Sequence, residues 1–191
     1  MRHQEFDTRE VLGKAMRVFW QKGYKGASLQ NLLDEMGIGK GSFYATFGSK
    51  RELFVQALKH FGDTESIVHT ITDLLPHTPA KEAIRQIFDR AINYGLTKQR
   101  VCLFGKTGFE FWQCDPDVAK EVTRGVKNLE DAFREVLLCG QGNGEIPLDR
   151  DATQLARFLT GVFYGLQVIV RTNPDRQVLE DIASTAIAAL N

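Results

Sequence analysis

The chain has little of the alternation of apolar and polar residues that marks β-strands, and no such stretch is flanked by hairpin turns. Long apolar runs are also missing. The longest, residues 158–170, is interrupted by Thr160 and Gln167 and is too short to cross a bilayer. The first residues lack the basic, apolar and small-residue order of a signal peptide. We therefore expect an all-α protein of the cytoplasm with no membrane partner.

Residue types that carry enzyme and metal chemistry are scarce or badly spaced. The three cysteines, Cys102, Cys114 and Cys139, are odd in number and form no Cys-x-x-Cys pair, which disfavours a disulfide scaffold and a zinc site. The histidines show no metal-ligand spacing, and no Gly-x-Ser-x-Gly motif occurs. The glycines of residues 37–41 follow a helical pattern rather than a strand, which argues against a phosphate-binding loop. We expect no metal, no cofactor and no enzymatic activity.

What is present is an uneven distribution of charge along a chain whose net charge is +0. Residues 1–61 contain 10 Lys and Arg against 6 Asp and Glu, whereas residues 62–191 contain 14 against 18. A basic amino-terminal part favours contact with phosphate, although chance variation on a solvated surface gives similar counts. Apolar residues recur at helical spacing in both parts. We predict two helical domains, residues 1–61 and 62–191.

A helix-turn-helix pattern spans about residues 28–47. A capping serine precedes an apolar stripe, and Gly37 then suits a tight turn. A short second helix is predicted for residues 40–47. Phe43 and Phe47 are four residues apart and share one helical face, which we predict to be buried. The opposite face is then free to enter a DNA major groove.

That opposite face and its surroundings carry small, hydroxylic and basic side chains. Glycine lets the backbone approach the bases, hydroxyl groups bond base edges or phosphates, and the methyl groups of Ala45 and Thr46 suit a thymine methyl. Lysine binds phosphate as a point charge, and a serine at a helix amino terminus lies where free amides favour an anion. The predicted DNA-binding residues are Ser28, Gly39, Lys40, Gly41, Ser42, Tyr44, Ala45, Thr46 and Lys50.

The same segments carry a resemblance to a known family. It covers most of residues 8–55 in three blocks: residues 9–26, residues 29–39, and the motif KGSFY at 40–44 with FGSKREL at 47–53. This pattern resembles the DNA-binding domain of the TetR family of bacterial transcriptional regulators. The resemblance implies a three-helix domain with the helix-turn-helix, a larger helical domain for ligand binding and dimerisation, and a palindromic double-stranded DNA operator as partner.

The last two predicted helices, about residues 151–171 and 174–190, are the most apolar of the chain. Gly161 and Gly165 lie four residues apart and permit close approach of another helix. Such a hairpin buries its apolar surface against the rest of the chain or against a twofold partner that completes a four-helix bundle. A homodimer also suits DNA reading, since two helices one DNA turn apart recognise a palindrome. The apolar stripe on the first helix comprises Leu155, Leu159, Val162, Leu166, Ile169 and Val170.

The middle of the larger domain is rich in aromatic residues, with polar groups such as Asn93 and Glu110 among them. Such a set forms either a core or an apolar cleft with a few polar anchors, as a small-molecule site requires. The second interpretation predicts a small hydrophobic ligand as effector. The predicted pocket residues are Tyr94, Phe104, Phe109, Trp112, Phe163 and Gln167.

Residues 101–106, with 115–118 after them, resemble a subgroup of the TetR family that includes the N-ethylmaleimide-responsive repressor. Lys106 lies about one helical turn after Cys102, close enough to lower the pKa of the thiol. A thiolate there reacts with electrophiles or oxidants, and Cys114 is the candidate resolving partner. The alternative is a small buried residue without reactivity. Cys102 and Lys106 are thus the predicted thiol sensor.

Taken together, these patterns predict a sequence-specific transcriptional repressor. Its homodimer is released from DNA by a small hydrophobic ligand or by an electrophile that modifies a thiol. The alternative is a dimeric small-molecule binding protein of the same fold without DNA recognition. Affinity for DNA discriminates between the two.

Overall fold

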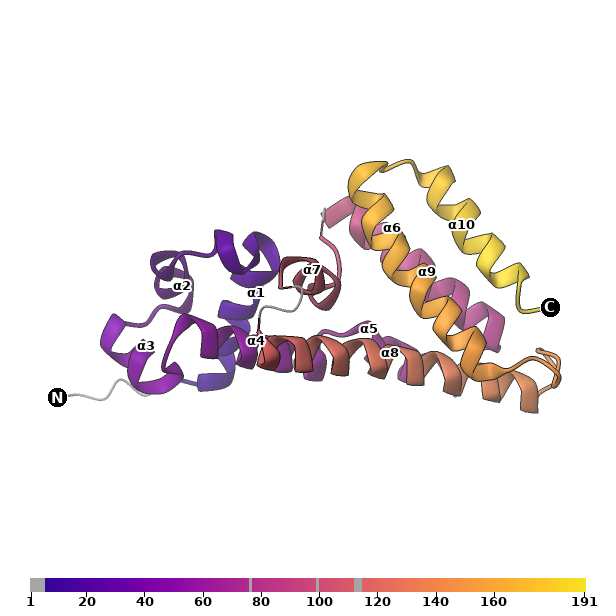
Figure 1. The fold of residues 1–191 in the computed structure, drawn as a ribbon, viewed down its shortest axis with the longest axis horizontal. Coiled ribbons are helices and arrows are strands. Elements are labelled where there is room, and N and C mark those ends of the chain that lie inside the picture. Colours follow the sequence, from indigo (N-terminus) through magenta and orange to yellow (C-terminus); the bar gives the residue numbers. More distant parts are fainter. Residues whose placement is uncertain (1–5, 76, 99, 112–114) are drawn as a thin grey trace. The chain divides into compact units, whose positions relative to one another are not determined.

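The computed structural model describes residues 6–75, 77–98, 100–111 and 115–191, and each regular element in them is an α-helix (Figure 1). The all-α prediction is therefore confirmed. Trp112 and Cys114, predicted as a pocket residue and a resolving thiol, lie outside the described residues. The helices are α1 (Thr8–Gly26), α2 (Leu29–Met36), α3 (Lys40–Phe47), α4 (Lys50–Thr64), α5 (Ile67–Leu74), α6 (Ala80–Lys98), α7 (Leu103–Glu110), α8 (Pro116–Gly142), α9 (Ala152–Thr172) and α10 (Arg176–Ala188).

By its internal contacts the chain forms two compact units. The described residues of 1–65 and 106–122 form the first, which we call the head, and those of 66–105 and 123–191 form the second, the body. The boundary predicted at residue 61 lies near the end of the first segment, and the head contains a second segment as well. Contacts between segments so far apart in sequence leave no periodic signal, because periodicity reports only which face of one helix is apolar.

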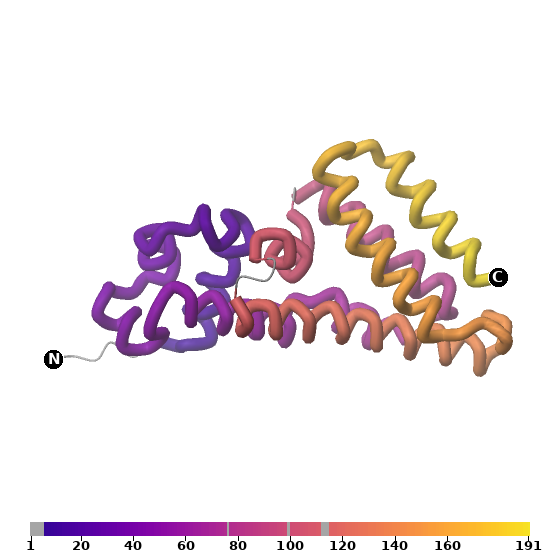
Figure 2. Tube along the Cα trace, viewed as in Figure 1, coloured from indigo at the N-terminus to yellow at the C-terminus, as the bar shows by residue number. Residues whose placement is uncertain are grey.

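The head is built around α1, which packs against α2 and α4, while α3 packs against α4. Figure 2 follows the chain through these four helices. Asp7 caps α1, since its Oδ1 accepts the amide of Arg9 at 2.8 Å. The rings of Phe19 and Phe54 then meet edge to face, with centroids 4.8 Å apart, at the centre of the head.

In the body, α6, α9 and α10 pack against one another, as Figure 1 shows. Phe88 of α6 and Phe133 of α8 are both fully buried, and their ring centroids are 6.1 Å apart. Side chains of α5, α6, α8, α9 and α10 join them in one continuous apolar core. The core accounts for most of the apolar residues that the sequence places at helical spacing in this part of the chain.

The end of α8 runs through a glycine-rich stretch. Residues 139–144 contain three glycines, a composition that favours a loop, but α8 continues to Gly142. Glycine is needed at position 140 because a Cβ there would lie 2.6 Å from the Cβ of Ala80. Gln141 ties the helix end to the next loop by donating to the carbonyls of Pro147 at 3.0 Å and Arg150 at 2.7 Å. Close packing thus outweighs the low helix propensity of glycine here.

The apolar stripe expected on α9 divides between two environments. Leu155, Leu159, Leu166 and Val170 are buried in the core of the body itself, and Val162 and Ile169 are partly buried. A second, outward stripe remains, formed at helical spacing by Phe158, Gly161, Gly165 and Val168. Phe158 is 44% exposed and Val168 is 42% exposed, and a Cβ added to either glycine would meet open space.

Candidate nucleic-acid interface

The turn that leads to α3 is fixed by local backbone chemistry. At the start of α2, Ser28 Oγ accepts the amide of Asn31 at 3.1 Å, and Asn31 Oδ1 accepts the amide of Ser28 at 3.4 Å. At its end, Gly37 takes the left-handed conformation, with φ 70° and ψ 28°, and donates its amide to the carbonyl of Leu33 at 2.9 Å. The predicted helix-turn-helix is therefore present, with its turn at the expected glycine.

Helix α3 has the two-sided character that the sequence predicted. Phe43 is fully buried and Phe47 is 2% exposed, and their ring centroids are 6.1 Å apart. The burial of both rings is confirmed. Of the predicted DNA-binding residues, Lys50 is partly buried and the others are exposed, namely Ser28, Gly39, Lys40, Gly41, Ser42, Tyr44, Ala45 and Thr46.

Lys50 does not extend freely into solvent. Its Nζ lies 4.4 Å from the ring centroid of Tyr24, a distance at which the cation is attracted to the aromatic face. Partial burial lowers the pKa of Lys50, and the nearby negative charge of Glu110 acts in the opposite direction. The ring holds this ammonium group near the amino terminus of α4, directly after the turn that follows α3.

Tyr24 belongs to an aromatic cluster that also contains Phe54 and Phe111. The ring centroid of Tyr24 is 5.0 Å from that of Phe54 and 5.0 Å from that of Phe111, and Phe54 and Phe111 are 5.3 Å apart. Phe111 directly follows α7. Through it, a segment distant in sequence becomes part of the hydrophobic core of the head, which the sequence did not predict.

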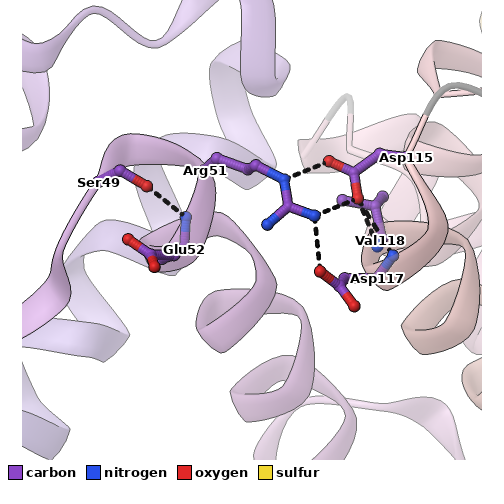
Figure 3. Close-up of polar contacts among 6 residues, drawn as sticks. All are labelled: Ser49, Arg51, Glu52, Asp115, Asp117 and Val118. Atoms are coloured by element: carbon purple, nitrogen blue, oxygen red, sulfur yellow. Dashed lines mark hydrogen bonds and ion pairs between the residues drawn. The ribbon is translucent and has the colours of Figure 1, made fainter.

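Arg51, at the start of α4, also links the two segments of the head, residues 1–65 and 106–122 (Figure 3). Its Nε and Nη2 donate to the two carboxylate oxygens of Asp115, each at 2.7 Å, and Nη2 also donates to Asp117 at 2.6 Å. Asp115 in turn accepts the amides of Asp117 and Val118 and so caps α8, a role that its place before Pro116 allowed. The hydrogen bonds from Arg51 lower the pKa of Asp115.

The predicted pKa shift at the thiol is wrong in direction. Burial raises the pKa of Cys102, while hydrogen bonds from the amides of Gly105 and Phe104 and from the Tyr164 hydroxyl oppose the rise. Lys106 has a different role, since its Nζ donates to the carbonyls of Trp20 at 3.1 Å and Gln21 at 3.0 Å. Sequence spacing placed the lysine one turn from the thiol but gave no information on what either group contacts.

The predicted pocket residues in the described part of the chain have different surroundings. Tyr94 borders an open hollow of about 480 Å³ along α6. Phe104 and Phe163 are buried, and the Gln167 side chain accepts the amide of Cys102 at 2.9 Å. Phe109 is 76% exposed and belongs to the head. The burial of Phe104 and Phe163 is what the core interpretation predicts, and the ligand pocket stays a prediction.

Within the described residues, no three His, Cys, Asp or Glu side chains gather to hold a metal ion. The helices of the same residues are all too short or too polar to cross a membrane. The exposed face of α3 carries the small, hydroxylic and basic side chains described above.

Comparison with known proteins agrees with this geometry. Residues 11–57 match the family model for bacterial regulatory proteins of the tetR family. Residues 80–186 match the model for the tetracyclin repressor-like C-terminal domain.

Three similar proteins illustrate the likeness. The uncharacterized HTH-type transcriptional regulator YezE of Bacillus subtilis (strain 168) is 35% identical over 100% of this chain and 99% of its own. The transcriptional repressor NemR of Escherichia coli (strain K12) is 24% identical over 94% of this chain and 92% of its own. A cysteine mutant of the TetR-family regulator CifR, solved in complex with 26-base-pair operator DNA, is 29% identical with a TM-score of 0.83, and each chain is covered fully. Because the family models and a full-length relative agree, the chain belongs to the TetR family and is a DNA-binding transcriptional regulator, not an enzyme.

Proposed function

We propose that the chain is a homodimeric repressor in which two copies of α3 read a palindromic operator. The observation that carries this proposal is the division of α3 into a buried face, held by Phe43 and Phe47, and an exposed face of small and hydroxylic residues. A helix with a face of small residues, here Gly41, Ser42, Ala45 and Thr46, fits the width of a major groove. The operator complex of the similar regulator CifR supports the same mode of binding.

The residues divide into two roles under this proposal. Gly41, Ser42, Ala45 and Thr46 face base edges, where hydroxyl groups form hydrogen bonds and methyl groups contact thymine. The remaining groups contact phosphates, which fix the register of the protein without carrying sequence information. The phosphate set comprises Ser28, Gly39, Lys40, Tyr44 and Lys50.

The outward stripe of α9 supports the dimer. Phe158 and Val168 are large apolar side chains left partly in water, and the open space at Gly161 and Gly165 allows a neighbouring helix to approach closely. A twofold partner that lays the same stripe against this one removes both apolar groups from water. A dimer also supplies the two reading helices that a palindrome requires.

The test is a salt titration of operator binding, with DNA from upstream of the gene that encodes the protein. We expect Tyr44→Phe and Lys50→Ala to weaken binding to all sequences. Lys50→Ala should also lower the slope of log affinity against log salt by about one for each subunit, because one phosphate contact is lost. Ser42→Ala should instead change the preference among operator variants. Light scattering on the same samples measures whether the chain is dimeric.

The outcomes separate the parts of the proposal. Glu135→Gln, a change of an exposed carboxylate on α8 in the body, is the control and should leave the affinity unchanged. If Tyr44→Phe, Lys50→Ala and Ser42→Ala all bind like the wild type, α3 is not the reading helix. A monomer that binds as tightly as a dimer would contradict the palindromic mode.

We further propose that modification of Cys102 releases the DNA. Its sulfur receives hydrogen bonds from the amides of Phe104 and Gly105 and from the Tyr164 hydroxyl, at the amino terminus of α7. An adduct on the sulfur displaces these donors and leaves the first turn of α7 uncapped. The effect is expected to reach the head because α7 ends in the segment that packs there.

Since burial raises the pKa of Cys102, little thiolate is present at neutral pH and the thiol should react slowly. Alkylation by N-ethylmaleimide should speed up about tenfold for each pH unit and continue to rise above pH 8.5, where an ordinary cysteine levels off. We expect release of DNA to follow alkylation in a variant that keeps Cys102 but carries Cys114→Ser and Cys139→Ser. Mass spectrometry measures the adduct, and fluorescence anisotropy measures the bound DNA.

Cys102→Ser in the same background is the matched control, because a serine hydroxyl still caps the helix. It should bind DNA as the wild type does, and N-ethylmaleimide should not release the DNA. If full alkylation of Cys102 leaves DNA binding intact, the thiol is not the sensor, and a small hydrophobic ligand becomes the proposed effector.

A further inference from the structure

Helix α1 contains a break just before the chain turns toward α2. Gly23 has φ 74° and ψ 174°, so the regular helix stops there and a short turn, Tyr24–Gly26, follows. A break of this kind leaves carbonyl groups without partners on one side and amide groups without partners on the other. On each side of the break one of these backbone groups, the Trp20 carbonyl and the Tyr24 amide, is in a partly buried place, where a lost hydrogen bond is costly.

Two side chains of α7 satisfy the two sides of this break. Lys106 Nζ donates to the carbonyls of Trp20 and Gln21 at 3.1 and 3.0 Å, on the side where the helix ends. Glu110 accepts the amide of Tyr24 at 3.1 Å with Oε2 and that of Lys25 at 2.8 Å with Oε1, on the side where the turn begins. Each charged group thus contacts two backbone groups of the break.

The signs of the charges match the polarity of the backbone. The carboxyl end of a helix carries partial negative charge and favours a cation, and the amino end of a helical turn favours an anion. Lys106 and Glu110 are four residues apart, so α7 presents them on one face, one turn apart. The order of the two residues is specific to the break. Exchanging them would place a lysine beside amide groups, which carry partial positive charge, and a glutamate beside carbonyl groups, which carry partial negative charge.

The residues that follow the break connect it to the DNA-binding surface. The Tyr24 amide is held by Glu110, and the Tyr24 ring lies under the Lys50 ammonium group at 4.4 Å. Four residues after Tyr24, Ser28 caps α2, the first helix of the helix-turn-helix. Phe111, next to Glu110 in sequence, packs edge to face against the Tyr24 ring, with the centroids 5.0 Å apart. A shift of the break would therefore move both a phosphate-binding lysine and the start of α2.

We propose that Lys106 and Glu110 are positioning residues for DNA reading, because they fix the joint at Gly23 that sets where α2 begins relative to α1. They touch no DNA and act through the backbone of residues 20–25. The proposal rests on the proposed reading of DNA by α3. Whether the two side chains hold the joint can nevertheless be tested by hydrogen exchange, without DNA.

The test compares Glu110→Gln with Lys106→Met in the full chain. An amide oxygen of glutamine is a weaker, neutral acceptor, and methionine keeps the length of lysine without its donors. We expect amide hydrogen exchange in residues 21–28 to become about tenfold faster in each variant, while exchange in the body stays unchanged. Affinity for the operator should fall about tenfold, but affinity for random DNA should stay within about twofold of the wild type.

Lys106→Arg and Glu135→Gln are the controls. Arginine still donates to carbonyls, so Lys106→Arg should keep wild-type hydrogen exchange and operator affinity. The distant change at Glu135 should affect neither. Unchanged exchange in residues 21–28 would overturn the proposed joint. Faster exchange with unchanged operator affinity would show that the joint does not position the reading helix.

A wild-type chain with no preference for any DNA sequence would be a failure of the proposed repressor function. The hydrogen-exchange comparison would still decide whether Lys106 and Glu110 hold the joint. The two failures are therefore distinguishable.

Discussion

Replacing Phe43 by alanine is expected to cost about 3–5 kcal/mol of the free energy of unfolding of the head and to abolish operator binding. The ring is fully buried, with the Phe47 ring 6.1 Å away and the Tyr44 ring 5.2 Å away, centroid to centroid. Its loss removes apolar burial and leaves a cavity beneath α3. Because small domains are stable by only about 5–15 kcal/mol, this single change takes a large part of the total.

Urea unfolding measures the cost, and anisotropy with operator DNA measures the binding. Phe109→Ala is the matched control, since it deletes the same atoms from a side chain of the head that is 76% exposed. Its effect on stability should stay within about 0.5 kcal/mol. If Phe43→Ala were as stable as Phe109→Ala, the ring would not anchor α3, and the two-sided model of this helix would fail.

The elements that sequence reasoning placed well are those fixed by neighbouring residues. Ser28 as a cap, Gly37 as a left-handed turn and the burial of Phe43 and Phe47 depend on spacing along a few residues. Capping, turn formation and helical sidedness are local, so the sequence displays them directly. The family resemblance rested on this same stretch, which is why the fold and the helix-turn-helix were predictable together.

The contacts of α7 and of the start of α8 were not predictable in the same way. Arg51 and Asp115, or Tyr24 and Glu110, are far apart in sequence, and no periodicity connects them. The spacing between Cys102 and Lys106 suggested that the lysine acts on the thiol. In the structure, the Lys106 ammonium group donates to the carbonyls of Trp20 and Gln21 instead. A pair of charges on one helix face has several potential partners, and only the tertiary structure selects among them.

The second large effect is expected at the joint in α1. Gly23→Ala should destabilise the head by about 1–3 kcal/mol, because φ 74° with ψ 174° is a backbone region that essentially only glycine occupies. A Cβ at this position would also lie 3.0 Å from Glu110 Oε2, the atom that accepts the Tyr24 amide. The substitution therefore strains the backbone and displaces the carboxylate that closes the break.

Gly26→Ala provides the matched control three residues later. Position 26 has no positive φ, and an added Cβ would lie 3.6 Å from the Lys22 Cβ, an ordinary contact. Alanine there should be neutral or stabilising by up to about 1 kcal/mol, since it restricts the unfolded chain more than glycine does. Urea unfolding of the two variants measures the difference, and similar stabilities would contradict the assignment of strain to Gly23.

A double-mutant cycle then asks whether Gly23 and Glu110 act as one unit. If the carboxylate stabilises the head only by holding the amides of the break, Glu110→Gln should cost much less in the Gly23→Ala background than in the wild type. We expect a coupling free energy of at least about 0.5 kcal/mol, as contacting residues usually show. Additive effects would mean that Glu110 stabilises the head independently of the break, and the carboxylate could then not transmit a change in α7 to the turn before α2.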